Sequence, residues 1–434
     1  MVASAIAIRH AYVPSLSGDP GLGRLHVIFL LALALATSVA GQWFLPGGLG
    51  ALPNLTLGLA ALGLLLVGKG SLRPIPRRLR PMVALTLGLV IWGLVVLLCS
   101  SDPATSLRYW ARCCLYLVFG VALLGAVLSQ KGRAPIEVTV LGFLMLLALI
   151  GMLETALPRL AVFAWFRTPH SLTIQPRVAS LLSSPNTLGA LMVVGVALGE
   201  SLREARRIAP DVSTLATTLF VFLAAQSGSR NAWMALCVTV ALLGIRRLLS
   251  PLRGLFVLAL FGLGLACLPI SRFQLGFADA SSLPVSAEHA RSGKAPTSLA
   301  EPLQSLSLRG ALWREGLIRW QNRPWLGLGP GVFSMDVAPS LPGNRRNQNM
   351  HSLPLSLLVE LGWPGLLASI TWVSMILRRA PRGHVAIVPM MVMIVVQVFD
   401  DFLYDPSFGL VFLSMSASLT ASTARGSDPA GSQP

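Results

Sequence analysis

Residues 349–364 read NMHSLPLSLLVELGWP, and in this stretch a long polar loop gives way to an apolar helix. His351 stands at the junction, and Ser352 is predicted to cap the helix that follows. Pro354 is compatible with this prediction, because backbone N–H groups in the first helical turn have no partner within the helix. Those N–H groups and the helix dipole favour the binding of an anion beside His351. The same positive helix end favours the neutral form of the His351 ring, which can accept a proton. The alternative is a histidine at the membrane interface without a chemical role, and the rest of the chain decides between the two.

The composition indicates a membrane protein. Of 434 residues, 54% are hydrophobic and 12% are charged, about half the charged fraction of a soluble domain. The mean hydropathy is +0.70, and several apolar runs approach the roughly 20 residues that cross a bilayer as a helix. We therefore predict an all-α polytopic membrane protein with about twelve transmembrane helices, at 27–45, 52–68, 81–99, 109–129, 136–157, 186–202, 211–226, 231–248, 251–270, 352–377, 384–399 and 407–423.

Arginine and lysine give the predicted orientation, because positively charged short loops stay in the cytoplasm. Alternate loops are basic, with Lys69, Arg73, Arg77, Arg78 and Arg80; Lys131 and Arg133; Arg203, Arg206 and Arg207; Arg246, Arg247 and Arg253; and Arg378, Arg379 and Arg382. With the N-terminus inside, these five loops are cytoplasmic. The predicted organisation is then an N-terminal transmembrane region of about nine spans (1–270), one large extracytoplasmic loop (271–350), a C-terminal transmembrane region of about three spans (351–423) and a disordered cytoplasmic tail (424–434).

The formal net charge of +17 raises the question of a nucleic-acid partner. The basic residues are spread over the loops that the positive-inside rule predicts, and no nucleic-acid recognition motif accompanies them. The five cysteines lie within or at the edge of predicted spans without metal-ligand spacing, so we interpret them as small buried thiols. We therefore expect membrane lipids around this chain, and neither nucleic acid nor a metal as its partner.

The large loop contains a helical pattern from Leu308 onward. Apolar residues recur at helical spacing up to Trp320, with the charged residues largely on other faces, which predicts an amphipathic helix on the membrane or on the bundle. The glycine-rich run 327–331 that follows is similar to a dinucleotide-binding loop only superficially, because no strand–helix unit surrounds it. We interpret it as a tight turn that leads towards His351.

Three predicted helices, the sixth, eighth and tenth, begin on the outer face. Their polar starts are Ser184-Pro185-Asn186, Ser229-Arg230-Asn231 and His351-Ser352, and Arg177 and Arg230 add full positive charges. If the three helix ends converge, they form an anion pocket with a candidate base, suited to a phosphate or diphosphate at the level of the lipid headgroups. The outward acids Asp400, Asp401 and Asp405 are interpreted as solvated loop carboxylates.

These motifs, taken in order, resemble those of the O-antigen ligase and polymerase superfamily. The resemblance rests on residues 226–230 (QSGSR), residues 323–333 (RPWLGLGPGVF), His351-Ser352 followed by Gly362, and Arg177 upstream of 184–186. It covers about residues 170–420. One position departs from the pattern, since Gly365 stands where ligases often carry threonine.

The resemblance implies an integral-membrane glycosyltransferase of the bacterial inner membrane with its active site facing the periplasm. Such an enzyme takes a glycan from undecaprenyl diphosphate, with inversion and without nucleotide sugar, metal or other cofactor. A ligase passes the glycan to lipid A–core, whereas the alternative, an O-antigen or exopolysaccharide polymerase, passes it to another glycan. His351 would be the catalytic base, and the predicted substrate-binding residues are Arg177, Arg230, Arg309 and Ser352.

Two other classes of protein remain open from the residues alone. A polysaccharide-precursor transporter or flippase would need charges near mid-membrane and a repeated half, and the chain shows no clear internal repeat. An intramembrane serine protease would use Ser227 or Ser229 with His351, but the serine turn carries no recognisable nucleophile motif.

Overall fold

A computed structural model describes most of the chain, and the residues it describes form helices joined by turns. It covers residues 20–40, 52–67, 77, 79–129, 136–157, 178–182, 184–267, 302–333, 350–402 and 405–425. The helices are α1 (Pro20–Ala40), α2 (Leu52–Val67), α3 (Arg80–Leu98), α4 (Pro103–Ser129), α5 (Ile136–Ala156), α8 (Pro185–Glu204), α9 (Pro210–Gln226), α10 (Arg230–Ile245), α11 (Pro251–Ala266), α14 (Pro302–Gln321), α16 (Leu353–Arg379), α17 (Ile387–Phe399) and α18 (Pro406–Arg425). The all-α prediction is confirmed for this part of the chain.

Each predicted span overlaps one of these helices, although the first, 27–45, is offset from α1 by several residues. Several of these helices begin at a proline. Proline suits the first helical position because a backbone N–H there would have no partner within the helix, so its absence costs nothing. Six helices, α3, α4, α5, α8, α16 and α18, are long and apolar enough to cross a membrane, and shorter apolar stretches occur in α1, α10, α11 and α17. Twelve crossings therefore stay a prediction.

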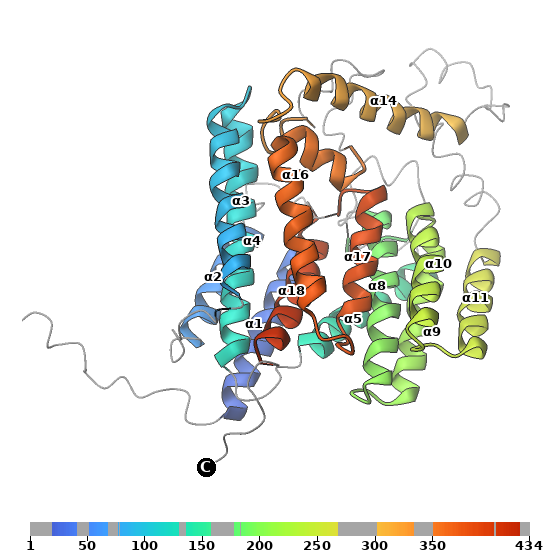
Figure 1. Cartoon of the computed structure of the whole chain (residues 1–434). Helices are drawn as coiled ribbons and strands as arrows, with labels where there is room; N and C mark the ends of the chain where they lie inside the picture. Colours follow the sequence, from blue (N-terminus) through green and yellow to red (C-terminus); the bar gives the residue numbers. More distant parts are fainter. Residues whose placement is uncertain are drawn as a thin grey trace, which may run out of the picture.

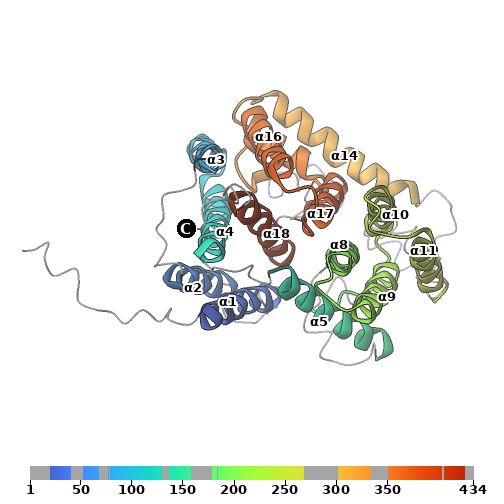
Figure 2. The same ribbon diagram turned by 60° about the horizontal axis from the view of Figure 1, so that its bottom comes forward.

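Two helices form the centre of the bundle. α8 packs against α5, α9, α10 and α17, whereas α18 packs against α1, α4, α5, α16 and α17, as Figures 1 and 2 show. From Thr187 to Leu202 every residue of α8 is buried, as expected of a helix that is apolar on all sides. The outer helices instead direct large apolar side chains outward, for example Leu87, Ile91 and Leu94 of α3. A continuous apolar surface of this kind is suited to lipid.

α14 lies across one end of the bundle, above α16 (Figure 1). It covers a second apolar core, formed by Leu312, Leu328, Val332, Phe333, Met350 and Val359. The predicted amphipathic helix therefore packs on the bundle, and it begins at Pro302, six residues before the predicted start at Leu308.

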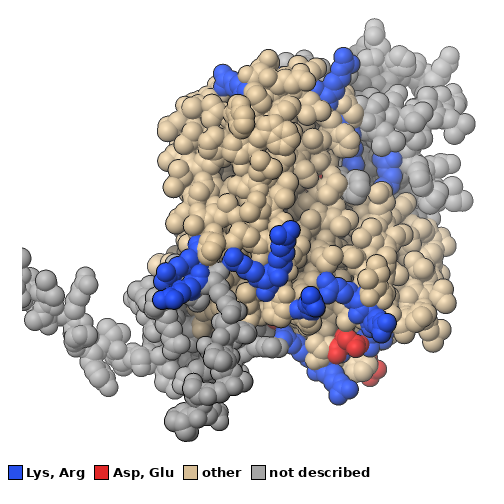
Figure 3. All heavy atoms as spheres, in the orientation of Figure 1, with Lys and Arg blue, Asp and Glu red and all other residues tan. Residues whose placement is uncertain are grey.

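Arginines gather towards the end opposite α14 (Figure 3). There, Arg246 Nη1 donates to the carbonyl of Arg382 at 3.3 Å, and Arg203 Nη2 donates to that of Leu248 at 3.0 Å. The basic segments after α8, α10 and α16 thus lie at one end of the molecule. This arrangement agrees with the predicted positive-inside orientation.

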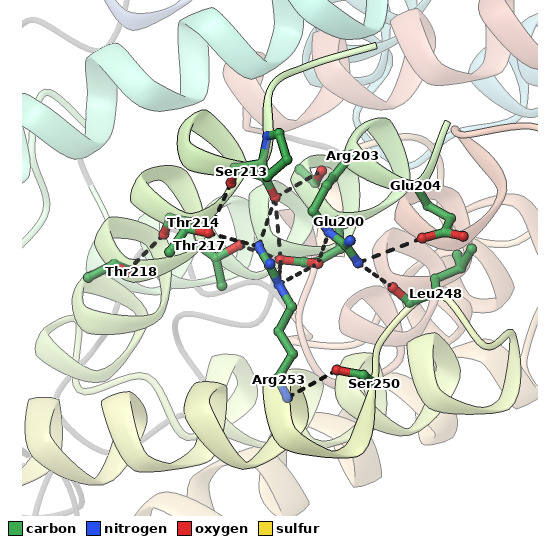
Figure 4. A network of polar contacts seen from close by, with 12 residues as sticks. Glu200, Arg203, Glu204, Ser213, Thr214, Thr217, Thr218, Leu248, Ser250 and Arg253 are labelled. Atoms are coloured by element: carbon green, nitrogen blue, oxygen red, sulfur yellow. Dashed lines mark hydrogen bonds and ion pairs between the residues drawn. The ribbon is translucent and has the colours of Figure 1, made fainter. Parts of the chain in front are cut away.

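A buried carboxylate ties three helices together at this basic end (Figure 4). Glu200 of α8 is fully buried and receives Arg203 Nε and Arg253 Nε, each at 3.0 Å, and Thr217 Oγ1 at 2.9 Å. A charge at this depth is tolerated because both cations and a hydroxyl compensate it. The cluster fixes α8, α9 and α11 at the end remote from His351.

Candidate active site at the α14 end of the bundle

α16 is interrupted near the end that carries α14, at Gly362. This glycine has φ 67° and breaks the helix, so the carbonyls of the preceding turn need partners elsewhere. The glycine-rich segment after α14 provides them, since Leu328 N–H donates to Val359 O at 2.9 Å and Gly329 N–H donates to Glu360 O at 3.1 Å. Residues 327–331 therefore dock on the helix break and are more than a connecting turn.

The break requires a glycine. Trp363 N–H donates back to Pro324 O at 3.1 Å, which brings the two backbones into contact. A Cβ on Gly362 would clash with Trp325 O. The two motifs that sequence analysis noted separately, residues 323–333 and Gly362, thus form one structural unit.

α14 also fixes the residue before His351. Trp313 Nε1 donates to Met350 O at 2.7 Å, and the buried Met350 side chain packs in the second core with Phe333. The chain therefore enters α16 from a fixed point, and the backbone of the next residue has little freedom.

His351 has a left-handed backbone, with φ 52°. This conformation costs a residue other than glycine roughly 1–2 kcal/mol and often marks a functional position. Its ring Nδ1 lies 2.9 Å from Oδ1 of Asp400, which follows α17. The imidazole is partly exposed, at 30%, whereas the Asp400 side chain is 9% exposed. The strained residue thus presents its ring between a buried carboxylate and the outer surface.

Two further donors orient the Asp400 carboxylate. Asn231 Nδ2 donates to Oδ2 at 3.2 Å, and the Asp401 backbone N–H donates to Oδ1 at 3.0 Å. Burial raises the pKa of Asp400. This effect is outweighed by the hydrogen bond and charge of His351, by the Asp401 N–H and by the charge of Arg309, so the pKa stays below 3.8. Because a carboxylate only accepts, Nδ1 carries a proton, and in the neutral ring Nε2 is the nitrogen able to accept one.

Two predicted arginines lie beside this pair. Burial lowers the pKa of Arg309, the charge of Asp400 raises it and that of Arg230 lowers it again, so Arg309 lies within electrostatic range of both residues. Arg230 is the first residue of α10 and precedes Asn231, which bonds Asp400. The structure thus places Arg230 and Arg309 near Asp400, the partner of His351.

The two acids after α17 differ from their interpretation as solvated loop carboxylates. Asp400 and Asp401 are each 6% exposed, and they belong to the site because the loop folds inward against α16. The contacts of Asp400 with His351 and of Asp401 with Ser356 join segments that are distant in the sequence, so the local sequence pattern gave no signal for them.

Other predicted residues have different outcomes. Ser352 occupies the N-cap position of α16, but its side chain makes no capping hydrogen bond, so that expectation was wrong. Arg177 lies outside the described residues. Shortly after it in the sequence, the backbone N–H groups of Ala179 and Ser180 donate to Glu154 of α5 at 3.0 and 2.7 Å, an anchor that sequence analysis did not assign.

The serines of the turn between α9 and α10 have structural roles. Ser227 Oγ donates to Ala224 O at 2.7 Å, and Ser229 Oγ accepts from Ala232 N–H as the N-cap of α10. Both are buried. This geometry gives no support to a serine nucleophile paired with His351.

Comparison with known proteins finds one family. Residues 215–370 match the family model described as O-Antigen ligase, a range that begins in α9 and ends within α16. Arg230, Arg309 and His351 lie inside the match, whereas Asp400 and Asp401 lie beyond it. No curated protein matches the chain.

Proposed function

The chain belongs to the O-antigen ligase superfamily, as its motifs predicted, and we propose that it transfers a glycan from undecaprenyl diphosphate to lipid A–core. The reaction takes place at the α14 end of the bundle, on the periplasmic face of a bacterial inner membrane. The polymerase alternative, with a second glycan as acceptor, uses the same donor and the same site.

His351 acts as the general base. The acceptor hydroxyl oxygen attacks the anomeric carbon of the donor sugar, and its proton passes to Nε2 of His351. The bond between that carbon and the diphosphate oxygen breaks, and the diphosphate leaves with the electron pair. A single displacement of this kind inverts the anomeric configuration.

Arg230 and Arg309 bind the diphosphate. Negative charge grows on the leaving group as the sugar–phosphate bond breaks, and guanidinium groups fixed beside it stabilise the transition state more than the ground state. Arg177 joins them in this proposal on sequence grounds, and Ser352 contributes a polar group beside His351.

The observation that carries the proposal is the contact between His351 and Asp400 beside two arginines. Asp400 holds the ring in the tautomer that exposes a basic nitrogen, the role that an aspartate has in hydrolase triads. The buried carboxylate also stabilises the imidazolium that forms when the ring accepts the acceptor proton. A histidine that only anchored the chain at the interface would not need this partner.

The test is an assay with purified protein, undecaprenyl diphosphate-linked glycan and lipid A–core. We expect glycosylated lipid A–core and free undecaprenyl diphosphate, and loss of both products in His351→Ala at unchanged protein level. Longer lipid-linked chains with no product on lipid A–core would assign the polymerase activity. Absence of any transfer by the wild type with either acceptor would overturn the proposal.

A further inference from the structure

A second contact lies directly behind the His351–Asp400 pair. Ser356 Oγ of α16 donates to Oδ2 of Asp401. Asp400 and Asp401 are adjacent, so one dipeptide after α17 holds both His351, just before α16, and Ser356, in the first half of that helix. The Asp401 backbone N–H also donates to Asp400 Oδ1, the oxygen that contacts the histidine.

The second contact is shielded from water. Ser356 is 3% exposed, and Asp401 and Glu360 are each 6% exposed. The other Asp401 oxygen, Oδ1, is buried and has no hydrogen-bond partner within the described residues. An ionised carboxylate in this place would leave a charged oxygen uncompensated, which is far more costly than a neutral carboxylic acid.

The surroundings of Asp401 raise the pKa of its carboxyl group. Burial raises the pKa of Asp401, the Ser356 hydrogen bond lowers it, the charges of Glu360 and Asp400 raise it, and His351 lowers it. Together these effects raise the pKa of Asp401 to about 7. The residues that act on Asp401 are Ser356 and Glu360 from α16 and Asp400 and His351 from the site. Cys113 of α4 lies within electrostatic range of Asp401, and Arg112 within range of Cys113. Glu360 lies four residues after Ser356 and hence on the same face of α16.

We propose that Ser356 and a neutral Asp401 form a positioning pair that holds His351 and Asp400 at their working distance. A neutral acid at residue 401 also avoids a second negative charge beside Asp400, in a site that has to bind a diphosphate. This inference rests on the proposed glycosyl transfer. Asp401 touches no substrate in it and acts only through its neighbours.

Four variants separate this role from general structural support. Asp401→Asn keeps a neutral group that can accept the Ser356 hydroxyl, so we expect kcat within about threefold of the wild type at neutral pH. Asp401→Ala and Ser356→Ala should lower kcat about tenfold or more at unchanged KM for the donor. Ser356→Thr, which keeps the hydroxyl group, should have a kcat close to that of the wild type. Wild-type activity in Ser356→Ala, or equal losses in Asp401→Asn and Asp401→Ala, would overturn the proposal.

The pH profile gives a readout that a purely structural contact would not change. Above neutral pH the wild-type rate should fall as Asp401 ionises, and Asp401→Asn should keep its rate there. The same alkaline decline in both proteins would contradict the inference.

An infrared spectrum tests the neutral acid without any substrate, so its result does not depend on the proposed reaction. Below neutral pH the wild type should show a carboxylic acid C=O band that Asp401→Asn lacks. If the two spectra agree, Asp401 is not protonated and the inference fails even where the transfer assay succeeds. Presence of the band in a protein without transferase activity would support the neutral acid and reject the proposed function.

Discussion

His351 and Asp400 are 49 positions apart in the sequence, and their side chains meet at 2.9 Å. The two residues approach from different elements, one from the start of α16 and the other from the end of α17. His351 adopts a left-handed backbone where it meets Asp400, and the backbone before it is fixed by Trp313. The contact therefore depends on α14, α16 and α17 together.

The first prediction concerns Asp400→Asn. An amide can donate to Nδ1 and so favour the wrong ring tautomer, which removes the base without removing the histidine. We expect kcat to fall about 10²- to 10⁴-fold, the usual contribution of general acid–base catalysis, at nearly unchanged KM for the donor. The measurement is the initial rate of transfer by purified protein at saturating donor.

Glu315→Gln is the matched control, because Glu315 is an acid of α14 that pairs with Arg319 at 2.9 Å. It should retain the wild-type rate. If Asp400→Asn is as active as Glu315→Gln, Asp400 has no part in orienting the base.

The second prediction concerns the arginines. Lysine keeps the charge of Arg230 and Arg309 but loses the planar fork that binds two phosphate oxygens. Each Arg→Lys change should raise the KM for the lipid-diphosphate donor about tenfold, as expected for the loss of one charged hydrogen bond. Arg314→Lys, on the exposed side of α14, should leave it unchanged. Unaltered donor KM in both site variants would remove the arginines from diphosphate binding.

Much of this architecture could be predicted from the sequence, since apolar runs and basic loops depend on local composition. The starts of α8 at Pro185 and of α10 at Arg230 agree with the predicted helix starts to within one residue. His351 and Arg230 were proposed from motifs and helix polarity and Arg309 from the family resemblance, and Arg309 lies within electrostatic range of Arg230 and of Asp400, the partner of His351. Their roles in catalysis stay predictions.

The partners of His351 could not be predicted, because they depend on tertiary contacts. Asp400 resembles any interfacial loop acid until α17 is placed beside α16. The break in α16 did leave a signal, since Gly362 and Pro364 interrupt an apolar run of helical length. Its significance became clear only with the segment 324–329, whose backbone groups complete the broken helix.

The third prediction tests orientation. In a version without the five native cysteines, Arg314→Cys on α14 should react with a membrane-impermeant thiol reagent in intact spheroplasts. Arg382→Cys, in the exposed turn after α16, should react only after lysis. The reverse pattern would place the site on the cytoplasmic face and exclude a periplasmic reaction.

The fourth prediction concerns the pH dependence of stability. The pKa of Asp401 is raised from 3.8 to about 7 in the folded protein, so between these values the folded state binds more protons than the unfolded state. The contribution of Asp401 to stability is therefore fully present below pH 3.8 and is lost as the pH rises through about 7. Thermal unfolding in detergent should show a smaller decline over this range for Asp401→Asn than for the wild type. Parallel curves for the two proteins would contradict the raised pKa.

The last prediction concerns Gly362→Ala. A left-handed backbone costs alanine roughly 1–2 kcal/mol, and the added Cβ would clash with Trp325 O, so the docked segment has to move. We expect a lower unfolding temperature and reduced transfer, because residues 327–331 and α14 also fix the entry to His351. Gly310→Ala on α14 is the control, since a Cβ there meets no atom within 4 Å and alanine favours the helix. Equal unfolding temperatures for Gly362→Ala and the wild type would show that the break in α16 does not depend on this glycine. An equal loss of stability in Gly310→Ala would show that the effect at Gly362 is not specific to the break.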